Sequence, residues 1–308
     1  GTSPWRPEGI PFNGTTVLDS DDFILAPRLP RSLTVVGGGV IGLEYATIFS
    51  TLDVPVTLVE PRDRLLEFMD REVVDYLVHL MRDRGIALRL GSGVESVRFG
   101  ADGTPVCILE DGRQTASEMV LFTSGRVGAT AGLNLLACSL TTDKRGRLPV
   151  NPETFQTVQP HIYAAGDVAE APDLFSGRHL VAAIQPNAAD QARVAALNMA
   201  GQPARMKGVL AINVLDSMGM ISSSFGEWQG VPGGDGVELA DEANGRYLSL
   251  QFEGDVLVGA TAIGLTQHVG VLRGLIQGRT RLGAWKEKLL ETPHRFVEAY
   301  LASQQVVR

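Results

Sequence analysis

Residues 33–42 read LTVVGGGVIG, a short apolar run that leads into three consecutive glycines. An unbroken run of Leu, Thr and Val is typical of a strand buried on both faces of a parallel sheet. Helical periodicity follows from Val40 to about Leu52, and residues 56–59 form a second β-type run before Glu60. The apolar residues at helical spacing are Ile41, Tyr45, Ile48, Phe49 and Leu52. The order of strand, glycine turn, helix and strand predicts a βαβ unit.

Three of the glycines fit the pattern G-x-G-x-x-G of dinucleotide-binding folds. Gly37 permits the tight turn out of the strand, Gly39 lets the backbone approach a pyrophosphate, and Gly42 lets the helix pack closely on the strand. Val40 and Ile41 begin the helix, whose free N–H groups and dipole favour a negative charge. We therefore expect these five residues to bind NAD(H).

Acidic and basic residues follow the glycines at positions that bear on which dinucleotide is bound. Glu60 ends the second strand about 20 residues on, where a carboxylate that accepts from a ribose 2′-hydroxyl is expected. This favours NAD over NADP, because a carboxylate repels a 2′-phosphate. Arg62 and Arg64 could turn toward a phosphate, so NADP stays open. Glu44, on the first helix turn after the glycines, is a candidate for the nicotinamide end; the alternative is an ordinary carboxylate on a helix face.

The rest of the chain alternates between helical and β-type patterns. In the first half the predicted elements are a helix over 71–84 ended by Gly85, a strand over 86–90, an antiparallel meander with strands near 94–99, 105–110 and 114–116, and a strand over 119–123. In the second half they are a strand over 162–165, a helix over 182–199, β-runs at 209–215, 236–239, 247–252 and 256–263, and helices over 269–276, 284–290 and 294–302.

A second motif lies at residues 157–167, which read TVQPHIYAAGD. The run resembles the T-x-x-x-x-[IV]-[YF]-A-x-G-D motif of the pyridine-nucleotide/disulfide oxidoreductase family of flavoproteins. In that family the final Asp hydrogen-bonds the ribityl chain of FAD. The resemblance therefore implies this role for Asp167, with Gly166 allowing the flavin to approach.

The resemblance extends over nearly the whole chain. Residues 32–126 are similar to the NAD domain of soluble transhydrogenases and dihydrolipoamide dehydrogenases, which implies that Gly125 and Arg126 contact the cofactor. Residues 184–201 and the closing part resemble rubredoxin reductases and the flavoprotein part of assimilatory nitrite reductases. The family's N-terminal FAD fingerprint, redox dithiol and C-terminal His-Pro…Glu pair are not found, and we expect His294 to lie at a surface helix start.

These observations predict an α/β fold with a Rossmann-like NAD-binding domain, a partial FAD-binding domain and a C-terminal α+β interface domain. The expected division is a connecting segment from the FAD domain at 1–31, an NAD(P)-binding domain at 32–124, the returning part of the FAD-binding domain at 125–205 and an interface or dimerisation domain at 206–308. The chain opens on a turn-rich stretch without Met, so we expect further residues upstream.

Composition narrows the classes of function. The 308 residues carry a net charge of −8, which argues against binding to nucleic acid or to an anionic membrane. No apolar run approaches the roughly 20 residues that span a bilayer. Cys107 and Cys138 form no close pair and are expected to be isolated buried thiols, which fits a reducing, cytoplasmic location. The five histidines are scattered, so no metal site is predicted.

The resemblance implies a flavin-dependent oxidoreductase. Hydride would pass between NAD(P)H and FAD, and electrons would then leave to an acceptor that the sequence does not identify. That chemistry belongs to the cofactors, so no side chain is assigned as catalytic. The expected partners are dinucleotides and a protein electron acceptor, in a homodimer or in a complex with an FAD-domain chain. The alternative is a non-catalytic NAD-binding subunit, or a fragment that needs another polypeptide for the FAD half.

Overall fold

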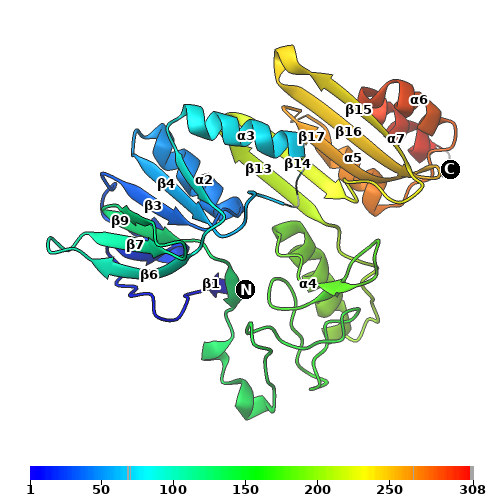
Figure 1. Cartoon of the computed structure of the whole chain (residues 1–308). Helices are drawn as coiled ribbons and strands as arrows, with labels where there is room; N and C mark the ends of the chain where they lie inside the picture. The colour runs from blue at the N-terminus through cyan, green and yellow to red at the C-terminus, as the bar shows by residue number, and fades with distance from the viewer. Residues whose placement is uncertain (68, 70, 266, 306–308) are drawn as a thin grey trace. The chain divides into compact units, whose positions relative to one another are not determined.

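The computed structural model in Figure 1 describes residues 1–67, 69, 71–265 and 267–305. The chain forms two compact units. The first unit comprises Ser3–Val127 and the turn Ser217–Gly219, and the second comprises Gly1–Thr2, Gly128–Asp216 and Met220–Arg308.

The first unit is built on a five-stranded parallel sheet in the order β2-β9-β3-β4-β5. A three-stranded antiparallel sheet, β6-β7-β8, accompanies it, and β1 pairs with β10. The elements are β1 (Thr2–Pro4), β2 (Val17–Asp19), α1 (Ser20–Ile24), β3 (Leu33–Val36), α2 (Val40–Thr51), β4 (Val56–Glu60), α3 (Arg71–Asp83), β5 (Ala87–Leu90), β6 (Val94–Phe99), β7 (Pro105–Leu109), β8 (Gln114–Ala116), β9 (Met119–Phe122) and β10 (Arg126–Gly128).

The parallel sheet is covered on both faces. Val36 and Val59 are aligned in register on β3 and β4 and belong to the same buried cluster as Val97 and Cys107 of the antiparallel sheet. The alternate positions of the sheet are buried as well, and α2 contacts β3 and β4. Because both faces are covered, the strands are apolar at successive positions rather than at every second one. This confirms the βαβ unit that the sequence predicts.

The second unit has a five-stranded antiparallel sheet in the order β13-β14-β17-β16-β15. Its elements are η1 (Ala131–Leu133), η2 (Leu135–Cys138), β11 (Ala171–Pro172), β12 (His179–Leu180), α4 (Gln185–Met199), β13 (Ile212–Ser217), β14 (Met220–Gly226), β15 (Asp235–Asp241), η3 (Glu242–Asn244), β16 (Arg246–Glu253), β17 (Val256–Ile263), α5 (Val269–Gln277), α6 (Trp285–Glu291), η4 (Pro293–Arg295) and α7 (Phe296–Gln305).

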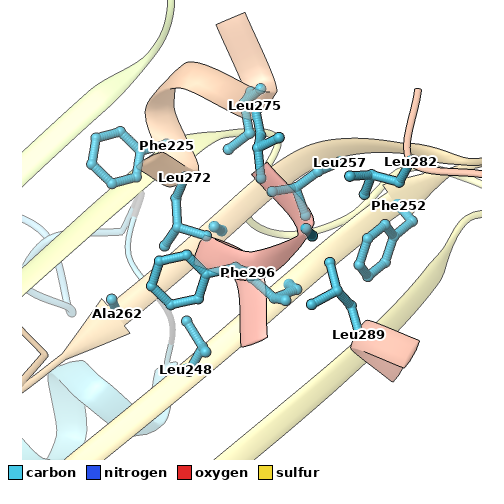
Figure 2. Close-up of a cluster of buried hydrophobic side chains, with 14 of the residues drawn as sticks. Phe225, Leu248, Phe252, Leu257, Ala262, Leu272, Leu275, Leu282, Leu289 and Phe296 are labelled. Carbon is cyan, nitrogen blue, oxygen red and sulfur yellow. The ribbon is translucent and has the colours of Figure 1, made fainter. Parts of the chain in front are cut away.

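One hydrophobic core joins this sheet to the C-terminal helices. Figure 2 shows Phe225 and Phe252 from the strands facing Leu272 of α5, Leu289 of α6 and Phe296 of α7. All five are at most 6% exposed. The end of the chain therefore forms an α+β layer of its own, as predicted. His294 is exposed in η4, directly before α7, as expected.

The structure differs from the sequence prediction at several places in the backbone, and the strand β14 was not predicted at all. Residues 162–165 form no strand; an isolated bridge joins Tyr163 to Gln156, because Thr157–Ile162 turns back on itself. Helix α4 begins at Gln185 rather than at 182. The segment 1–31 is more than a connection, since β2 is fully buried and pairs with β9 in the parallel sheet. Its three residues are too few to show a periodicity.

The expectation that both cysteines are buried is wrong, and the apolar residues that recur at helical spacing on α2 are not all buried. On α2, Ile48 and Leu52 are 53% and 50% exposed, whereas the buried face carries Leu43 and Ala46. The helix is apolar on more than one side, so helical spacing did not identify the side that packs. Cys138 is exposed; Cys107 is buried, and burial raises the pKa of its thiol to about 12.

Candidate functional site

The glycine turn between β3 and α2 is shaped by close contacts of the backbone. Gly37 has φ of +112°, a conformation that glycine adopts readily, and its N–H donates to the carbonyl of Val59 at 2.8 Å. A Cβ at Gly37 would lie 2.8 Å from the Thr123 carbonyl oxygen, and one at Gly42 would overlap the carbonyl oxygen of Gly37. Packing within the chain therefore excludes a side chain at both positions.

Gly39 differs from these two glycines because the space beside it is open. No atom outside its immediate neighbours lies within 4 Å of the place where its Cβ would be. Gly39 is also the N-cap of α2, and it supplies no side chain to the helix end. Val40 and Ile41 open the helix, and the first N–H groups of a helix have no acceptor within it. An open space against bare amides at a helix N-terminus suits a diphosphate.

Glu60 lies at the end of β4 and is 2% exposed. One carboxylate oxygen accepts the N–H of Gly38 at 2.6 Å and Nη2 of Arg62 at 3.2 Å. The other accepts the backbone N–H of Arg62 at 3.1 Å and its Nε at 2.7 Å. Burial by itself raises the pKa of Glu60, but the hydrogen bonds from Arg62 and Gly38 outweigh it, so the pKa lies below its usual value. The carboxylate is therefore charged at neutral pH and tied to the glycine turn.

A pocket of about 350 Å³ opens beside the first turns of α2. It brings together Ile41, Glu44 and Arg126, three residues that the sequence analysis predicts as cofactor contacts. The complete lining is Ser20, Asp21, Ile24, Ile41, Glu44, Tyr45, Ile48 and Arg126. The pocket combines exposed isoleucine side chains with charged groups of both signs, which suits a flat heteroaromatic ring that carries a polar substituent.

The charges in this pocket interact with one another. Arg126 Nη1 lies 3.2 Å from a carboxylate oxygen of Asp21. Burial raises the pKa of the Tyr45 phenol, and the negative charges of Asp21 and Glu44 raise it further. Tyr45 therefore stays protonated and donates to the Ser20 carbonyl at 3.3 Å. Gly125, which precedes Arg126, has φ of +116°, so the chain turns sharply there after β9.

The other two predicted residues, Gly166 and Asp167, belong to the second unit. Gly166 has φ of +86°, and its N–H donates to Oε1 of Gln191 at 2.7 Å. Gln191 is fully buried on α4, and its Nε2 has no partner among the described residues. One helical turn earlier, the buried Oδ1 of Asn187 is also without a partner in the described part of the chain. Gln191 therefore ties α4 to the glycine turn, and two buried polar atoms of this helix have no partner among the described residues.

The first unit thus holds every predicted site residue except Gly166 and Asp167. Sequence reasoning missed the contribution of Ser20 and Asp21, because they follow a strand too short to recognise. A signal was present, since Asp19 caps α1 by accepting from two N–H groups. Sequence reasoning also missed Gln191. The sequence feature that could have identified it is its position four residues after Asn187, which places two polar side chains on the same face of one helix.

Other kinds of site find no support in the described residues. Among them, no group of three or more His, Cys, Asp or Glu side chains could hold a metal ion. Within the same residues, no helix is both long and apolar enough to cross a membrane. Both cysteines are free, and they lie in different units.

Comparison with known proteins agrees with this geometry. The family profile described as "Pyridine nucleotide-disulphide oxidoreductase" matches residues 1–195. The soluble pyridine nucleotide transhydrogenase of Mycobacterium bovis (strain BCG) is 41% identical over 203 residues, which are 66% of this chain and 41% of that protein. The protein of the same name from Aliivibrio fischeri is 44% identical over 179 residues, 58% of this chain and 38% of its own length.

A solved structure resembles almost all of the chain. The covalent complex of putidaredoxin reductase with putidaredoxin gives a TM-score of 0.80 at 22% identity and covers 99% of this chain and 73% of the matched chain. At this identity the likeness concerns the fold. The chain spans less than half the length of the two transhydrogenases.

Proposed function

The chain belongs to the pyridine nucleotide-disulphide oxidoreductase family, and from that membership we propose that it passes hydride between NAD(P)H and FAD. The observation that carries the proposal is the open space at Gly39, which faces the bare N-terminus of α2 next to the anchored carboxylate of Glu60. The open space beside Gly39 supports the placement of a pyrophosphate at this helix N-terminus.

In this proposal the first unit binds and orients the nicotinamide dinucleotide. The amides of Val40 and Ile41 hold the pyrophosphate, and the dipole of α2 favours its negative charge. The nicotinamide ring occupies the pocket that Ile41, Glu44 and Arg126 line. Its apolar walls reduce the access of water to the reacting carbon, which protects a hydride in transit.

The residues of the second unit fit a flavin. Asp167 would accept hydrogen bonds from the ribityl hydroxyls, and Gly166 leaves room for the chain of the cofactor. The unsatisfied Nε2 of Gln191 and Oδ1 of Asn187 are available to a polar group. When bound, FAD supplies an electron sink that accepts hydride and releases electrons onward. The protein positions the cofactor and surrounds it, and none of its side chains has to move a proton.

Partners and location follow from the same proposal. The final acceptor is a soluble electron carrier, as the structural neighbour solved with putidaredoxin suggests. The antiparallel sheet β13–β17 with its helices provides the dimer interface, or the surface that receives an FAD-domain chain. We place the protein in the cytoplasm, since its two cysteines are free and free thiols persist in reducing compartments.

The cheapest test is to titrate the purified chain with NADH and then with FAD, following nucleotide fluorescence and flavin absorbance. We expect saturable NADH binding to the 33.0 kDa species, and faster reduction of added FAD by NADH than in buffer. Binding of NADH without any effect on FAD would favour the non-catalytic alternative. If NADH does not bind, the proposal is wrong.

A further inference from the structure

The pocket beside the first turns of α2 carries more negative than positive charge. Its charged lining residues are two carboxylates, Asp21 and Glu44, and one guanidinium, that of Arg126. One negative charge is therefore left over. Burial raises the pKa of the Tyr45 phenol in the same wall, and the charges of Asp21 and Glu44 raise it further. Both carboxylates thus act on the inside of the pocket.

The other charged groups of α1 and its cap do not cancel this excess. Asp22 follows Asp21 in the first turn of α1 and pairs with Arg6 at 2.7 Å. Arg6 also pairs with Asp19, again at 2.7 Å, so one arginine serves two carboxylates there. Arg126, the guanidinium of the pocket, lies 3.2 Å from Asp21. The segment that forms this wall is therefore acidic even after its ion pairs are counted.

The two redox states of a nicotinamide differ in charge at the ring. In NADH the dihydropyridine ring is neutral. When its C4–H bond breaks and a hydride leaves with both electrons, the ring becomes a pyridinium with one positive charge. The adenosine and pyrophosphate parts are the same in both states. A pocket with one carboxylate in excess therefore attracts the oxidised ring more strongly than the reduced ring.

Asp21 decides the sign of the charge in this pocket. Without it, Glu44 and Arg126 would balance, and the guanidinium of Arg126 would have lost the carboxylate at 3.2 Å. The side chain of Asp21 is 56% exposed and that of Arg126 is 32% exposed, so solvent and salt screen part of the interaction. The expected effect is therefore moderate, and it should decrease as salt is added.

We propose that Asp21, by compensating Arg126, makes this pocket bind NAD⁺ more tightly than NADH. This rests on the proposed function, because it assumes that the nicotinamide ring occupies the pocket. Tighter binding of the oxidised form lowers the reduction potential of the bound couple, by about 30 mV for a 10-fold preference. Bound NADH then gives up its hydride more readily, so the site favours hydride transfer away from NADH.

The test compares Asp21→Asn with a matched control, Asp22→Asn. Both residues lie in the first turn of α1 and pair with an arginine, but Asp21 lines the pocket and Asp22 does not. NAD⁺ and NADH differ in net charge, so a change in the charge of the whole chain also affects their relative affinity. The two substitutions change that total charge equally. Each protein is titrated calorimetrically with NAD⁺, NADH and ADP-ribose, which lacks the nicotinamide.

We expect the parent chain to bind NAD⁺ more tightly than NADH. Asp21→Asn should lower the ratio of the Kd for NADH to the Kd for NAD⁺ by about 3- to 10-fold, the effect of one screened charge near the ring. Its Kd for ADP-ribose should change by less than about 2-fold, which also shows that the variant is folded. Asp22→Asn and Asp21→Glu, which keeps the charge, should retain the parent's ratio within about 2-fold.

Two results would overturn the inference and leave the proposed function intact. One is tighter binding of NADH than of NAD⁺ by the parent, and the other is the same ratio in Asp21→Asn as in Asp22→Asn. If Asp21→Asn does not fold, a salt series on the parent decides, and a ratio that stays constant between about 0.05 and 0.5 M salt contradicts an electrostatic origin. Failure of the parent to bind any of the three probes rejects the proposed function as well.

Discussion

A side chain at Gly39 would meet no other part of the protein, whereas one at Gly42 would collide with the Gly37 carbonyl. The two glycines therefore have different tasks. Gly42 is needed for the close approach of α2 to the turn, and Gly39 leaves room for something outside the chain. Sequence pattern alone assigns both to one motif, and the surroundings of each position separate them.

We predict that Gly39→Val leaves the thermal midpoint within a few degrees of the parent but weakens NADH binding by at least about 10-fold, because the new side chain occupies the phosphate space. Gly42→Val should instead lower the free energy of unfolding by about 1–3 kcal/mol, since overpacking forces the turn to shift. NADH titration and thermal unfolding of both variants measure these effects. Equal NADH affinity of Gly39→Val and the parent would count against the assigned site.

Glu60 makes part of the stability depend on pH. Its pKa is lowered in the folded chain because the hydrogen bonds from Arg62 and Gly38 outweigh burial. A carboxyl whose pKa is lower when folded stabilises the protein above its unfolded pKa, about 4.3, and this contribution is lost as pH falls through the folded value. The free energy of unfolding, measured with urea at pH 7 and below pH 4, should decrease less on acidification for Glu60→Gln than for the parent. An equal acid loss in both proteins would refute this assignment.

At the scale of elements, the short helix α1 depends on its cap. Asp19 accepts the N–H groups of Asp21 and Asp22 at 2.9 Å and also the Nε of Arg6 at 2.7 Å. The cap thereby fixes Asp21 and Ile24 in the wall of the pocket beside α2. A segment that the sequence analysis describes as a connection thus supplies one side of the candidate site.

We predict that Asp19→Ala lowers the free energy of unfolding by about 0.5–2 kcal/mol, the usual effect of removing an N-cap. Asp19→Asn keeps an acceptor for the helix N–H groups, so its free energy of unfolding should decrease less than that of Asp19→Ala. Urea denaturation of the two variants beside the parent tests the cap. Identical losses in both would mean that the charge pair with Arg6, rather than the cap, carries the effect.

Helix α2 has apolar residues on its exposed face as well as on its buried face. Ile48 and Leu52 are exposed in the first unit, and Ile24 of α1 is 73% exposed. Helical spacing identifies a helix but cannot choose between two apolar faces. The choice is made by the parallel sheet, which takes the face with Leu43 and Ala46 and leaves the other open.

At the scale of the whole molecule, the chain divides into two units, each with buried hydrophobic residues of its own. We predict two transitions in a calorimetric unfolding scan. NADH should raise the midpoint of only one transition, because a ligand stabilises only the unit that binds it. At an NADH concentration of 100 times the Kd, the free energy of unfolding of that unit rises by about 2.7 kcal/mol. A shift of both midpoints would contradict the assignment of the nucleotide to the first unit alone, and a single transition would contradict the independent unfolding of the two units.

By itself, the sequence determined the local features of this protein. The βαβ order, the glycine turn, the meander and the C-terminal helices follow from periodicity and turn residues, which are properties of neighbouring positions. The family was evident because residues 157–167, one continuous stretch of the chain, resemble a motif of that family. Only the tertiary structure decided which face of α2 is buried, that β2 joins the sheet, and that Glu60 is saturated by Gly38 and Arg62. These depend on contacts between segments far apart in the chain, or on the geometry of a single side chain, and no pattern of spacing encodes either.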